Sequence, residues 1–351
     1  MGAGHCYHPP ISGLTGNIWS RRKKGQLATV PEAETWKLLE QRPLPAGRAR
    51  VISISNQKGG VAKTTTAINL GAALALEGLR VLVVDVDSQA NATTGLGLDH
   101  RSLERSTYDL LIEGTPLAEI TVPTPVQGLD CAPASLDLAG AEVELVAMTQ
   151  RELRLVDALK EGRGDYDFIF IDCPPSLGLL TLNALAAAED LIVPVQCEYY
   201  ALEGLGQLLG NAERVRRALN PGLRIAGFLL TMYDARTKLS SQVADDVRSH
   251  FGDLVLSTVI PRSVRLSEAP SFGEPVLTLD PSSRGSIAYR LAARELINRY
   301  GAERDRTEDT QVSRPAPAKP GPGGRGYGVA TPEPEGLDRA WPRTQPWTAA
   351  S

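Results

Sequence analysis

Two lysines and a pair of threonines around a glycine turn are the residues of this sequence best suited to hold a phosphate group. Lys58 and Lys63 flank the turn Gly59-Gly60-Val61-Ala62, and Thr64-Thr65 follow directly. Backbone N–H groups of such a turn, together with the start of a helix, bind phosphate oxygens, and a lysine neutralises the terminal phosphates. We therefore expect the nucleotide-binding residues to be those from Lys58 to Thr65.

The spacing of this segment is close to the P-loop pattern G-x-x-x-x-G-K-[ST], with two departures. Ala62 stands where the second glycine is expected, and Lys58 is an extra lysine before the glycine pair. An alanine at position 62 costs little if its backbone angle φ is negative. A plain glycine-rich turn with two surface lysines is the alternative reading, and the apolar run before the turn and the helical spacing after it disfavour it.

Three aspartates follow apolar runs typical of buried strands. Asp85 and Asp87 end the run 80–87, and Asp172 ends the run 166–172. The chemistry of open α/β sheets lies at the carboxyl ends of the strands, so these carboxylates should lie beside the phosphates. Asp172 would reach Mg²⁺ through a water, with the Thr64 hydroxyl as a direct ligand. Paired carboxylates can also cap helices, which is the less favoured interpretation next to a P-loop.

The elements that must position these residues alternate between strand and helix. Strands are predicted at 51–54, 80–87, 129–132, 166–172, 191–195, 225–232 and 254–260, with amphipathic helices after the P-loop and at 286–300. This order predicts an α/β fold, a P-loop NTPase with a doubly wound, mostly parallel sheet flanked by helices. We expect one ATPase domain at 51–301, between a largely disordered extension at 1–50 and a disordered, Pro/Gly-rich tail at 302–351.

Charge is distributed unevenly along the 351 residues, although the net charge is only −4. Residues 51–200 hold 9 Lys/Arg against 21 Asp/Glu, whereas residues 201–300 hold 13 against 10. A basic face is therefore expected only on the second half. Four distant cysteines suggest neither a disulfide framework nor a metal site, and no apolar run is long enough for a membrane span.

The chain resembles the ParA/MinD family of dimeric ATPases at several motifs. The P-loop has the form K-G-G-x-x-K-[ST]-[ST], and the segment 88–95 is similar to the family's P-Q-G-N-A-T segment, with Ser88 and Ala90 in place of Pro and Gly. CEYYALEGL at 197–205, TMYDARTKLS at 231–240 and PRSVRLSEAPS at 261–271 resemble the chromosomal ParA/Soj branch. The resemblance covers roughly residues 51–300.

This resemblance implies a function and the residues that perform it. ATP with Mg²⁺ would hold two subunits in a sandwich dimer that binds double-stranded DNA without sequence preference and partitions chromosome or plasmid DNA. Hydrolysis, stimulated by a ParB-type centromere-binding protein, would release the DNA, and the protein would be cytoplasmic and nucleoid-associated. The implied catalytic residues are Lys58, acting on the partner subunit's nucleotide, Lys63, and Asp87, which orients the attacking water.

The remaining implied roles concern the metal, the base and the DNA. Asp85 would join Thr64 and Asp172 at the magnesium ion, and Pro261 would lie near the purine. Arg236 and Arg265 would contact DNA, because a guanidinium pairs well with phosphate oxygens. Nearby basic residues that could extend this patch, or be ordinary surface charges, are Arg214, Arg216, Arg217, Lys238 and Arg262.

Three other functions stay open at this point. The main alternative is a MinD-like membrane-associated positioning ATPase, which the absence of a basic amphipathic terminal helix disfavours, so no stable membrane association is expected. An iron–sulfur ATPase would need paired cysteines, and none are close in the sequence. A ligase or synthetase that activates a small substrate is the third, and the extra lysine gives no reason for it.

Overall fold

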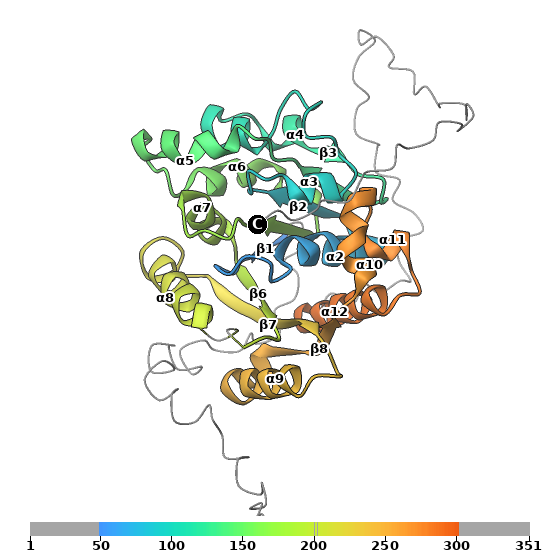
Figure 1. Cartoon of the computed structure of the whole chain (residues 1–351). Helices are drawn as coiled ribbons and strands as arrows, with labels where there is room; N and C mark the ends of the chain where they lie inside the picture. Colours follow the sequence, from blue (N-terminus) through green and yellow to red (C-terminus); the bar gives the residue numbers. More distant parts are fainter. Residues whose placement is uncertain (1–48, 200, 202, 302–351) are drawn as a thin grey trace, which may run out of the picture. The chain divides into compact units, whose positions relative to one another are not determined.

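Eight strands form one sheet in the computed structural model, which describes residues 49–199, 201 and 203–301. The strands are β1 (Arg50–Ile54), β2 (Val81–Asp85), β3 (Val122–Pro123), β4 (Leu129–Ala132), β5 (Phe168–Asp172), β6 (Asp190–Gln196), β7 (Arg224–Tyr233) and β8 (Val255–Pro261). Their order across the sheet is β3-β4-β2-β5-β1-β6-β7-β8 (Figure 1). The extension expected at 1–50 and the tail expected at 302–351 lie almost wholly outside the described residues.

Helices connect the strands and cover both faces of the sheet. The α-helices are α2 (Lys63–Leu76), α3 (Asn91–Gly95), α4 (Leu117–Ile120), α5 (Leu138–Ala147), α6 (Arg154–Gly162), α7 (Leu179–Ala187), α8 (Glu203–Ala218), α9 (Lys238–Phe251), α10 (Val264–Glu268), α11 (Val276–Leu279) and α12 (Arg284–Tyr300). Shorter turns of helix are η3 (Asp109–Glu113), η4 (Arg163–Asp165), η5 (Gly252–Leu254) and η6 (Ala269–Phe272).

All the strand pairs are parallel except that of β3 with β4. Sequence patterning predicted the seven longer strands because most of them carry a nearly continuous apolar run, which is typical of strands buried on both faces. It missed β3, which has only two residues and pairs through Val122 with Cys131. The predicted doubly wound, mostly parallel sheet is therefore confirmed.

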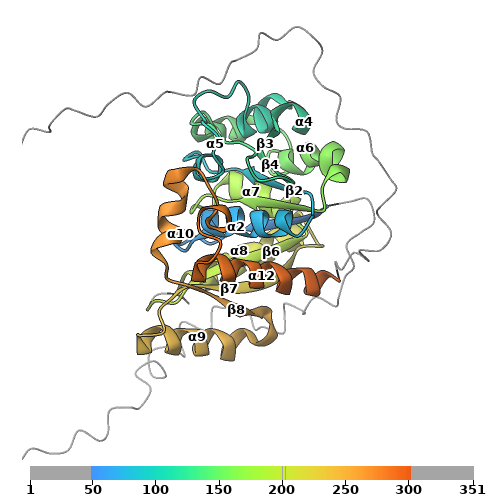
Figure 2. The same ribbon diagram turned by 90° about the vertical axis from the view of Figure 1, so that its right-hand side faces the viewer.

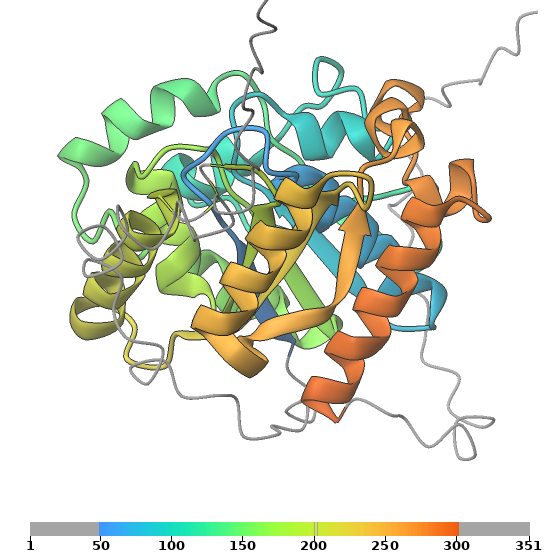
Figure 3. The ribbon, with the colours of Figure 1, turned by 60° about the horizontal axis from the view of Figure 1, so that its bottom comes forward.

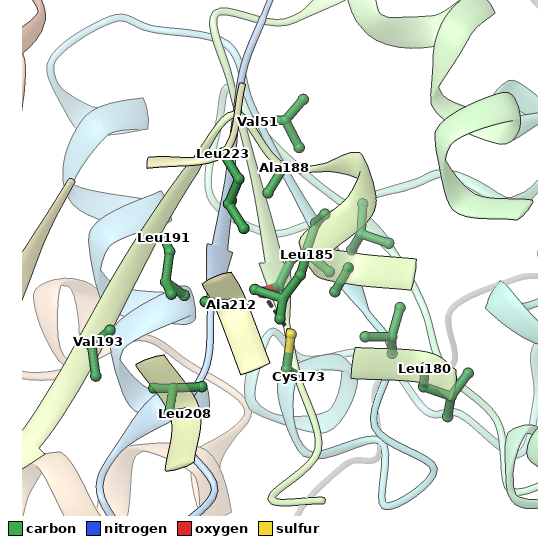
Figure 4. Packing of buried hydrophobic residues seen from close by; sticks show 14 of the residues in the cluster. Val51, Cys173, Leu180, Leu185, Ala188, Leu191, Val193, Leu208, Ala212 and Leu223 are labelled. Atoms are coloured by element: carbon green, nitrogen blue, oxygen red, sulfur yellow. Dashed lines mark hydrogen bonds between the residues drawn. The ribbon is translucent and has the colours of Figure 1, made fainter. Parts of the chain in front are cut away.

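Alternate residues of the strands point to opposite faces of the sheet and pack into two separate hydrophobic cores. On one face, Val51 and Leu191 pack with helices α5 to α9, as the close view in Figure 4 shows for α7 and α8. On the other face, Ile52 and Ile54 pack with α2 and α10 to α12. Figure 2 shows α2 and α12 lying along this second face, and Figure 3 shows α12 (orange) running beside the edge strand β8. The sheet is thus packed between two hydrophobic layers, which fix the positions of its strand ends.

The strand predicted at 80–87 is two residues shorter than expected at its carboxyl end. β2 ends at Asp85, whose carboxylate accepts hydrogen bonds from the backbone N–H of Asp87 and of Thr93. A carboxylate that binds nearby backbone N–H groups competes with the strand's own ladder and turns the chain. Asp87 consequently lies in the turn that follows the carboxyl end of β2.

The amino ends of the central strands carry a buried ionic cluster. Arg50 donates to Glu189 at 2.6 Å, its guanidinium lies 5.1 Å above the ring of Tyr300, and Arg163 pairs with Glu189. The Tyr300 hydroxyl donates to Asp190 at 2.9 Å. Burial raises the pKa of Asp190 to about 6, against the attraction of Arg50. This cluster ties the start of β1 to the end of α12.

Candidate functional site

A pocket of about 330 Å³ opens where the P-loop meets the segments after β2 and β5 and the carboxyl end of β7. The P-loop side is lined by Gly59, Gly60, Ala62, Lys63, Thr64 and Thr65. The opposite side is lined by Asp87, Gln89, Asn91, Pro175 and Met232. Seven of the residues predicted to bind nucleotide or to act in catalysis therefore lie around one cavity.

The two glycines of the turn leave space that a side chain would fill. A β-carbon built on Gly59 or on Gly60 would have no atom within 4 Å, and Gly60 has a φ of +72°. Their backbone therefore faces open pocket, where it can approach a ligand closely. Glycine is the residue that allows both this approach and the left-handed conformation. The turn has the shape of a phosphate cradle.

Lys63 is a buried lysine at the start of α2. Its side chain is directed back over the turn, where Nζ donates to the carbonyl oxygen of Lys58 at 3.4 Å. Burial lowers the pKa of Lys63, while the negative charge of Asp172 acts in the opposite direction. A buried cation with one long hydrogen bond is poised to gain from an anion in the pocket.

Lys58 lies at the start of the turn but does not line the pocket. Its backbone N–H donates to Asn56 Oδ1 at 3.0 Å, and Asn56 Nδ2 donates to the carbonyl oxygen of Pro194 on β6. This pair of bonds fixes the turn to the neighbouring strand. Val61 is also predicted to bind nucleotide, but its side chain is buried beneath the loop and its carbonyl accepts from Thr231.

Asp172 has the properties expected of a ligand to a divalent cation. It is fully buried, and neither carboxylate oxygen makes a well-formed hydrogen bond with a described residue. Burial raises its pKa well above the usual range, the neighbouring Asp85 adds to this, and the nearby Thr64 hydroxyl opposes it. A buried carboxylate without partners is costly, so the side chain fits a site completed by Mg²⁺.

The described residues contain no set of three or more His, Cys, Asp or Glu side chains that could hold a metal alone. Mg²⁺ is usually bound by one or two protein oxygens together with waters and substrate phosphates, so Asp172 and Thr64 suit it without such a set. Asp85 lies beside Asp172 in strand register. Its oxygens, however, already accept from Asp87 N–H and from both the N–H and the hydroxyl of Thr93. Asp85 therefore fastens α3 to the end of β2, and its place in the magnesium shell stays a prediction.

Asp87 lies in the pocket wall as predicted from its position after β2. Its Oδ1 accepts from the backbone N–H of Gln89 at 3.0 Å. Sequence reasoning did not select Gln89, Asn91, Pro175 or Met232, although each lies at or just after the carboxyl end of a strand. That position was the signal that could have found them.

Two alanines lie in the left-handed conformation at the edges of this site. Ala62 has φ +71° and ψ +36°, and Ala90 has φ +51° and ψ +34°. The condition stated for a low cost at Ala62, a negative φ, is therefore not met. A methyl group in this region crowds the following carbonyl oxygen and costs about 1–2 kcal/mol. Both alanines stand where the resembled motif has glycine, so the backbone keeps the glycine geometry under strain.

Arg236 and Arg265, the predicted DNA contacts, lie away from the pocket lining on two other segments. Arg236 follows β7, is 87% exposed, and pairs through two nitrogens with Asp234. Arg265, on α10, pairs with Glu268 at 3.2 Å and with Asp280 at 3.4 Å. Both guanidinium groups are accessible. Asp234 and Glu268 are carboxylates close in sequence to the arginine they pair with, whereas Asp280 follows α11.

Pro261 lies near the pocket lining, and two of the additional basic residues lie in ion pairs on α8. Pro261 ends β8 beside Tyr233, which directly follows the pocket residue Met232. Two of the arginines suggested as an extended patch, Arg216 and Arg217, both pair with Glu213 on α8. Their charge is therefore partly compensated within the helix.

None of the described helices combines the length and the apolar character that crossing a membrane requires.

Known proteins similar to this chain include chromosome-partitioning proteins. The family model described as an AAA domain matches residues 49–225. The chain is 54% identical over 247 residues to the sporulation initiation inhibitor protein Soj of Bacillus subtilis, covering 70% of this chain and 98% of that protein. It is also 54% identical over 265 residues to the chromosome partitioning protein ParA of Caulobacter vibrioides, covering 75% and 98%.

Two solved structures extend the comparison to the fold. A Mycobacterium smegmatis protein described as cobyrinic acid a,c-diamide synthase, with a bound ATP analogue and magnesium, is 42% identical, has a TM-score of 0.64, and matches over 73% of this chain and 97% of its own. The septum site-determining protein MinD of Pyrococcus horikoshii, complexed with Mg-ADP, is 30% identical with a TM-score of 0.58, over 71% and 96%.

The two relatives named above are 54% identical to this chain and match it over 98% of their own length. The chain belongs to the ParA/Soj family of chromosome-partitioning ATPases.

Proposed function

We propose that this chain is an ATP-hydrolysing switch that binds DNA without sequence preference and partitions chromosome or plasmid DNA. The observation that carries the proposal is the incomplete charge balance of the pocket. A buried lysine and a buried, unpartnered aspartate flank a glycine cradle. The phosphate oxygens of ATP would pair with the buried lysine, and Mg²⁺ would pair with the buried aspartate.

The residues of the pocket divide the work of hydrolysis. Lys63 binds the β- and γ-phosphate oxygens, and the backbone of Gly59 and Gly60 encloses them. Thr64 and Asp172 hold Mg²⁺, which neutralises charge that develops on the phosphate oxygens. Asp87 accepts a hydrogen bond from the attacking water and orients it toward the γ-phosphorus.

Dimerisation belongs to the same proposal. The Lys58 side chain starts at the rim of the pocket without lining it, so it is available to a nucleotide held by a second copy. A cation supplied in trans to a transferring phosphoryl group can stabilise the charge of the transition state. We expect an ATP-bound homodimer, hydrolysis stimulated by a ParB-type partner, release of DNA afterwards, and association with the nucleoid in the cytoplasm.

The test is binding of random-sequence duplex DNA with ATP, ADP or no nucleotide across a series of salt concentrations. ATP-dependent binding that weakens steeply with salt would support a phosphate-contacting clamp. Arg236→Ala and Arg265→Ala should each weaken binding and reduce the salt slope by about one. Arg105→Ala is the matched control, because Arg105 is also exposed and paired with a carboxylate but lies in the acidic half of the chain.

Two outcomes would redirect the proposal. No DNA binding in any nucleotide state, with ATP-dependent binding to anionic liposomes, would favour the MinD-like function instead. ATP consumption that depends on a small acceptor molecule rather than on DNA would favour a synthase, the activity named for the Mycobacterium structure.

A further inference from the structure

A five-residue helix connects the nucleotide pocket with the segment that carries Arg265. α3 begins at Asn91, which lines the pocket, and ends at Gly95. A β-carbon built on Gly95 would lie 2.6 Å from Ile68 of α2 and 3.8 Å from Pro270 of η6. The far end of α3 is therefore enclosed between the P-loop helix and η6, the segment after α10, whose place is marked by the α10 label in Figure 1.

The start of α3 is fastened to the strand end that carries the acids. Thr93 donates to Asp85 through both its N–H and its hydroxyl, at 2.9 and 2.8 Å. The carbonyl of Thr93 then accepts from Leu98 N–H at 3.2 Å, which closes the turn around Gly97. A displacement of the β2 end or of the residues after Asp87 must therefore move this turn.

The turn at Gly97 meets a second glycine turn, at Gly273, backbone to backbone. A β-carbon on Gly97 would lie 2.9 Å from the carbonyl oxygen of Gly273, and one on Gly273 would lie 3.0 Å from the α-carbon of Gly97. Both residues have positive φ, at +83° and +65°. No side chain separates the two turns, so the contact has little of the compliance that flexible side chains would give.

The Gly273 turn closes the segment that bears Arg265. It follows η6 directly, and its N–H donates to Pro270 at 3.2 Å. On the other side of this segment, Leu266 of α10 packs against Gly285 at the start of α12. Arg265 thus lies on a short segment held at Leu266 and touched at Gly273, and Figure 2 shows α10 near one end of α2.

We infer that the Gly97–Gly273 contact is the positioning contact through which the nucleotide state of the pocket sets the position of Arg265 on DNA. The inference rests on the proposed DNA-binding function. Two backbone turns in van der Waals contact transmit a shift of α3 directly to η6. Each ligand would then bias one arrangement of the same unit, which is the physical requirement for coupling between separate sites.

The chain offers matched glycine controls for a substitution test. Gly78 has φ +87°, close to Gly97, and Gly301 has φ +60°, close to Gly273. A β-carbon on either control would have no atom within 4 Å. Replacing each of the four by alanine therefore imposes similar backbone strain, but only Gly97→Ala and Gly273→Ala also push the two turns apart.

The measured quantity is the ratio of DNA affinities with ATP and with ADP, on random-sequence duplex. In Gly97→Ala and Gly273→Ala this ratio should fall at least about fivefold, the lower end of usual coupling between sites, while ATP affinity without DNA stays within about twofold. Gly78→Ala and Gly301→Ala should keep the original ratio. An unchanged ratio in the first pair, or an equal loss in the controls, overturns the inference.

A second measurement needs no substitution and does not depend on a variant that folds. Hydrogen–deuterium exchange of the unsubstituted chain should change in peptides covering residues 264–273 when MgATP is added without DNA. No change there overturns the inference and leaves the proposed function standing. Absence of ATP-dependent DNA binding by the unsubstituted chain overturns the proposed function, and the inference with it.

Discussion

Charged side chains are buried at both ends of the central strands, but the two sets differ in how far other side chains compensate their charge. At the amino ends, Arg50 faces Glu189 and Asp190, and Tyr300 donates to Asp190. At the carboxyl ends, the oxygens of Asp172 lack a hydrogen-bond partner among the described residues, and Lys63 has only a long bond to a carbonyl. Arg50 Nε also lacks a hydrogen-bond partner among the described residues, but it lies 3.7 Å from the Asp190 carboxylate. The amino-end charges are thus compensated by other side chains of the fold, whereas the proposed MgATP would compensate Lys63 and Asp172.

The largest effect that would test this contrast comes from Arg50→Met. Removing the arginine takes the cation from Asp190 and leaves Glu189 paired with Arg163, and breaking a buried ion pair on one side costs about 3–5 kcal/mol. The free energy of unfolding, from urea titration, should fall by this amount while the rate of ATP hydrolysis well below the unfolding transition stays the same. Arg80→Met is the control, because the Arg80–Asp167 pair is 3.7 Å long and Arg80 is 41% exposed. A loss of hydrolysis equal to the loss of stability would break the distinction between the two ends.

Lys63→Ala should give the opposite pattern. We expect hydrolysis to fall by about 10²–10³-fold, the usual effect of removing one group that stabilises transition-state charge. The unfolding midpoint without nucleotide should stay constant or rise, since a buried cation is removed. Steady-state phosphate release and thermal unfolding measure the two quantities, with Lys160→Ala as an exposed control. Strong destabilisation without nucleotide would mean that Lys63 is a structural charge like Arg50.

A pH series tests the cluster at the amino ends of the strands, through the titration of Asp190. The folded-state pKa of Asp190, about 6, lies above its ordinary value of 3.8, so the folded state binds the proton more tightly. The free energy of unfolding should therefore decrease as pH rises from about 4 to about 6, by about 3 kcal/mol from this group, and then level off. Asp190→Asn should lack this decrease, because the amide oxygen can still accept from Tyr300. Parallel pH profiles for the variant and the original chain would contradict the assignment.

The smallest effect concerns the strained alanines around the pocket. Ala62→Gly and Ala90→Gly should each raise the free energy of unfolding by up to about 1 kcal/mol, because relief of left-handed strain exceeds the entropy cost of glycine. Ala139→Gly, at an exposed position in helix α5, should lower it by about 0.5–1 kcal/mol. Calorimetric unfolding of the three variants gives the sign. Destabilisation by all three would show that neither pocket alanine is strained.

Sequence patterning predicted what depends on neighbours along the chain. The strand, turn and helix around Lys63 follow from a local apolar run and a glycine turn, and Asp87 and Asp172 follow from their places after such runs. The sign of φ at Ala62 could not be predicted from the sequence, because the P-loop is held by hydrogen bonds to β7 and β6, which are distant in sequence. The amino-end cluster joins residues 139 positions apart, Arg50 and Glu189, and no pattern connects them. Asp234 and Glu268 lie within three positions of Arg236 and Arg265, so their pairings are local in sequence, whereas the pairing of Arg265 with Asp280 depends on the fold.

The amino-end cluster also brings the first and last elements of the described fold together. β1 begins at Arg50 and α12 ends at Tyr300, and these two side chains stack on each other at the edge of the sheet opposite the pocket. A core limited to residues 49–301 could therefore be joined end to end through a short peptide and reopened elsewhere. The exposed turn at Gly252, where a side chain would meet nothing within 4 Å, offers such an opening. A circular permutant of this kind would place new chain ends beside α9 and leave the P-loop, with its flanking strand and helix, uncut.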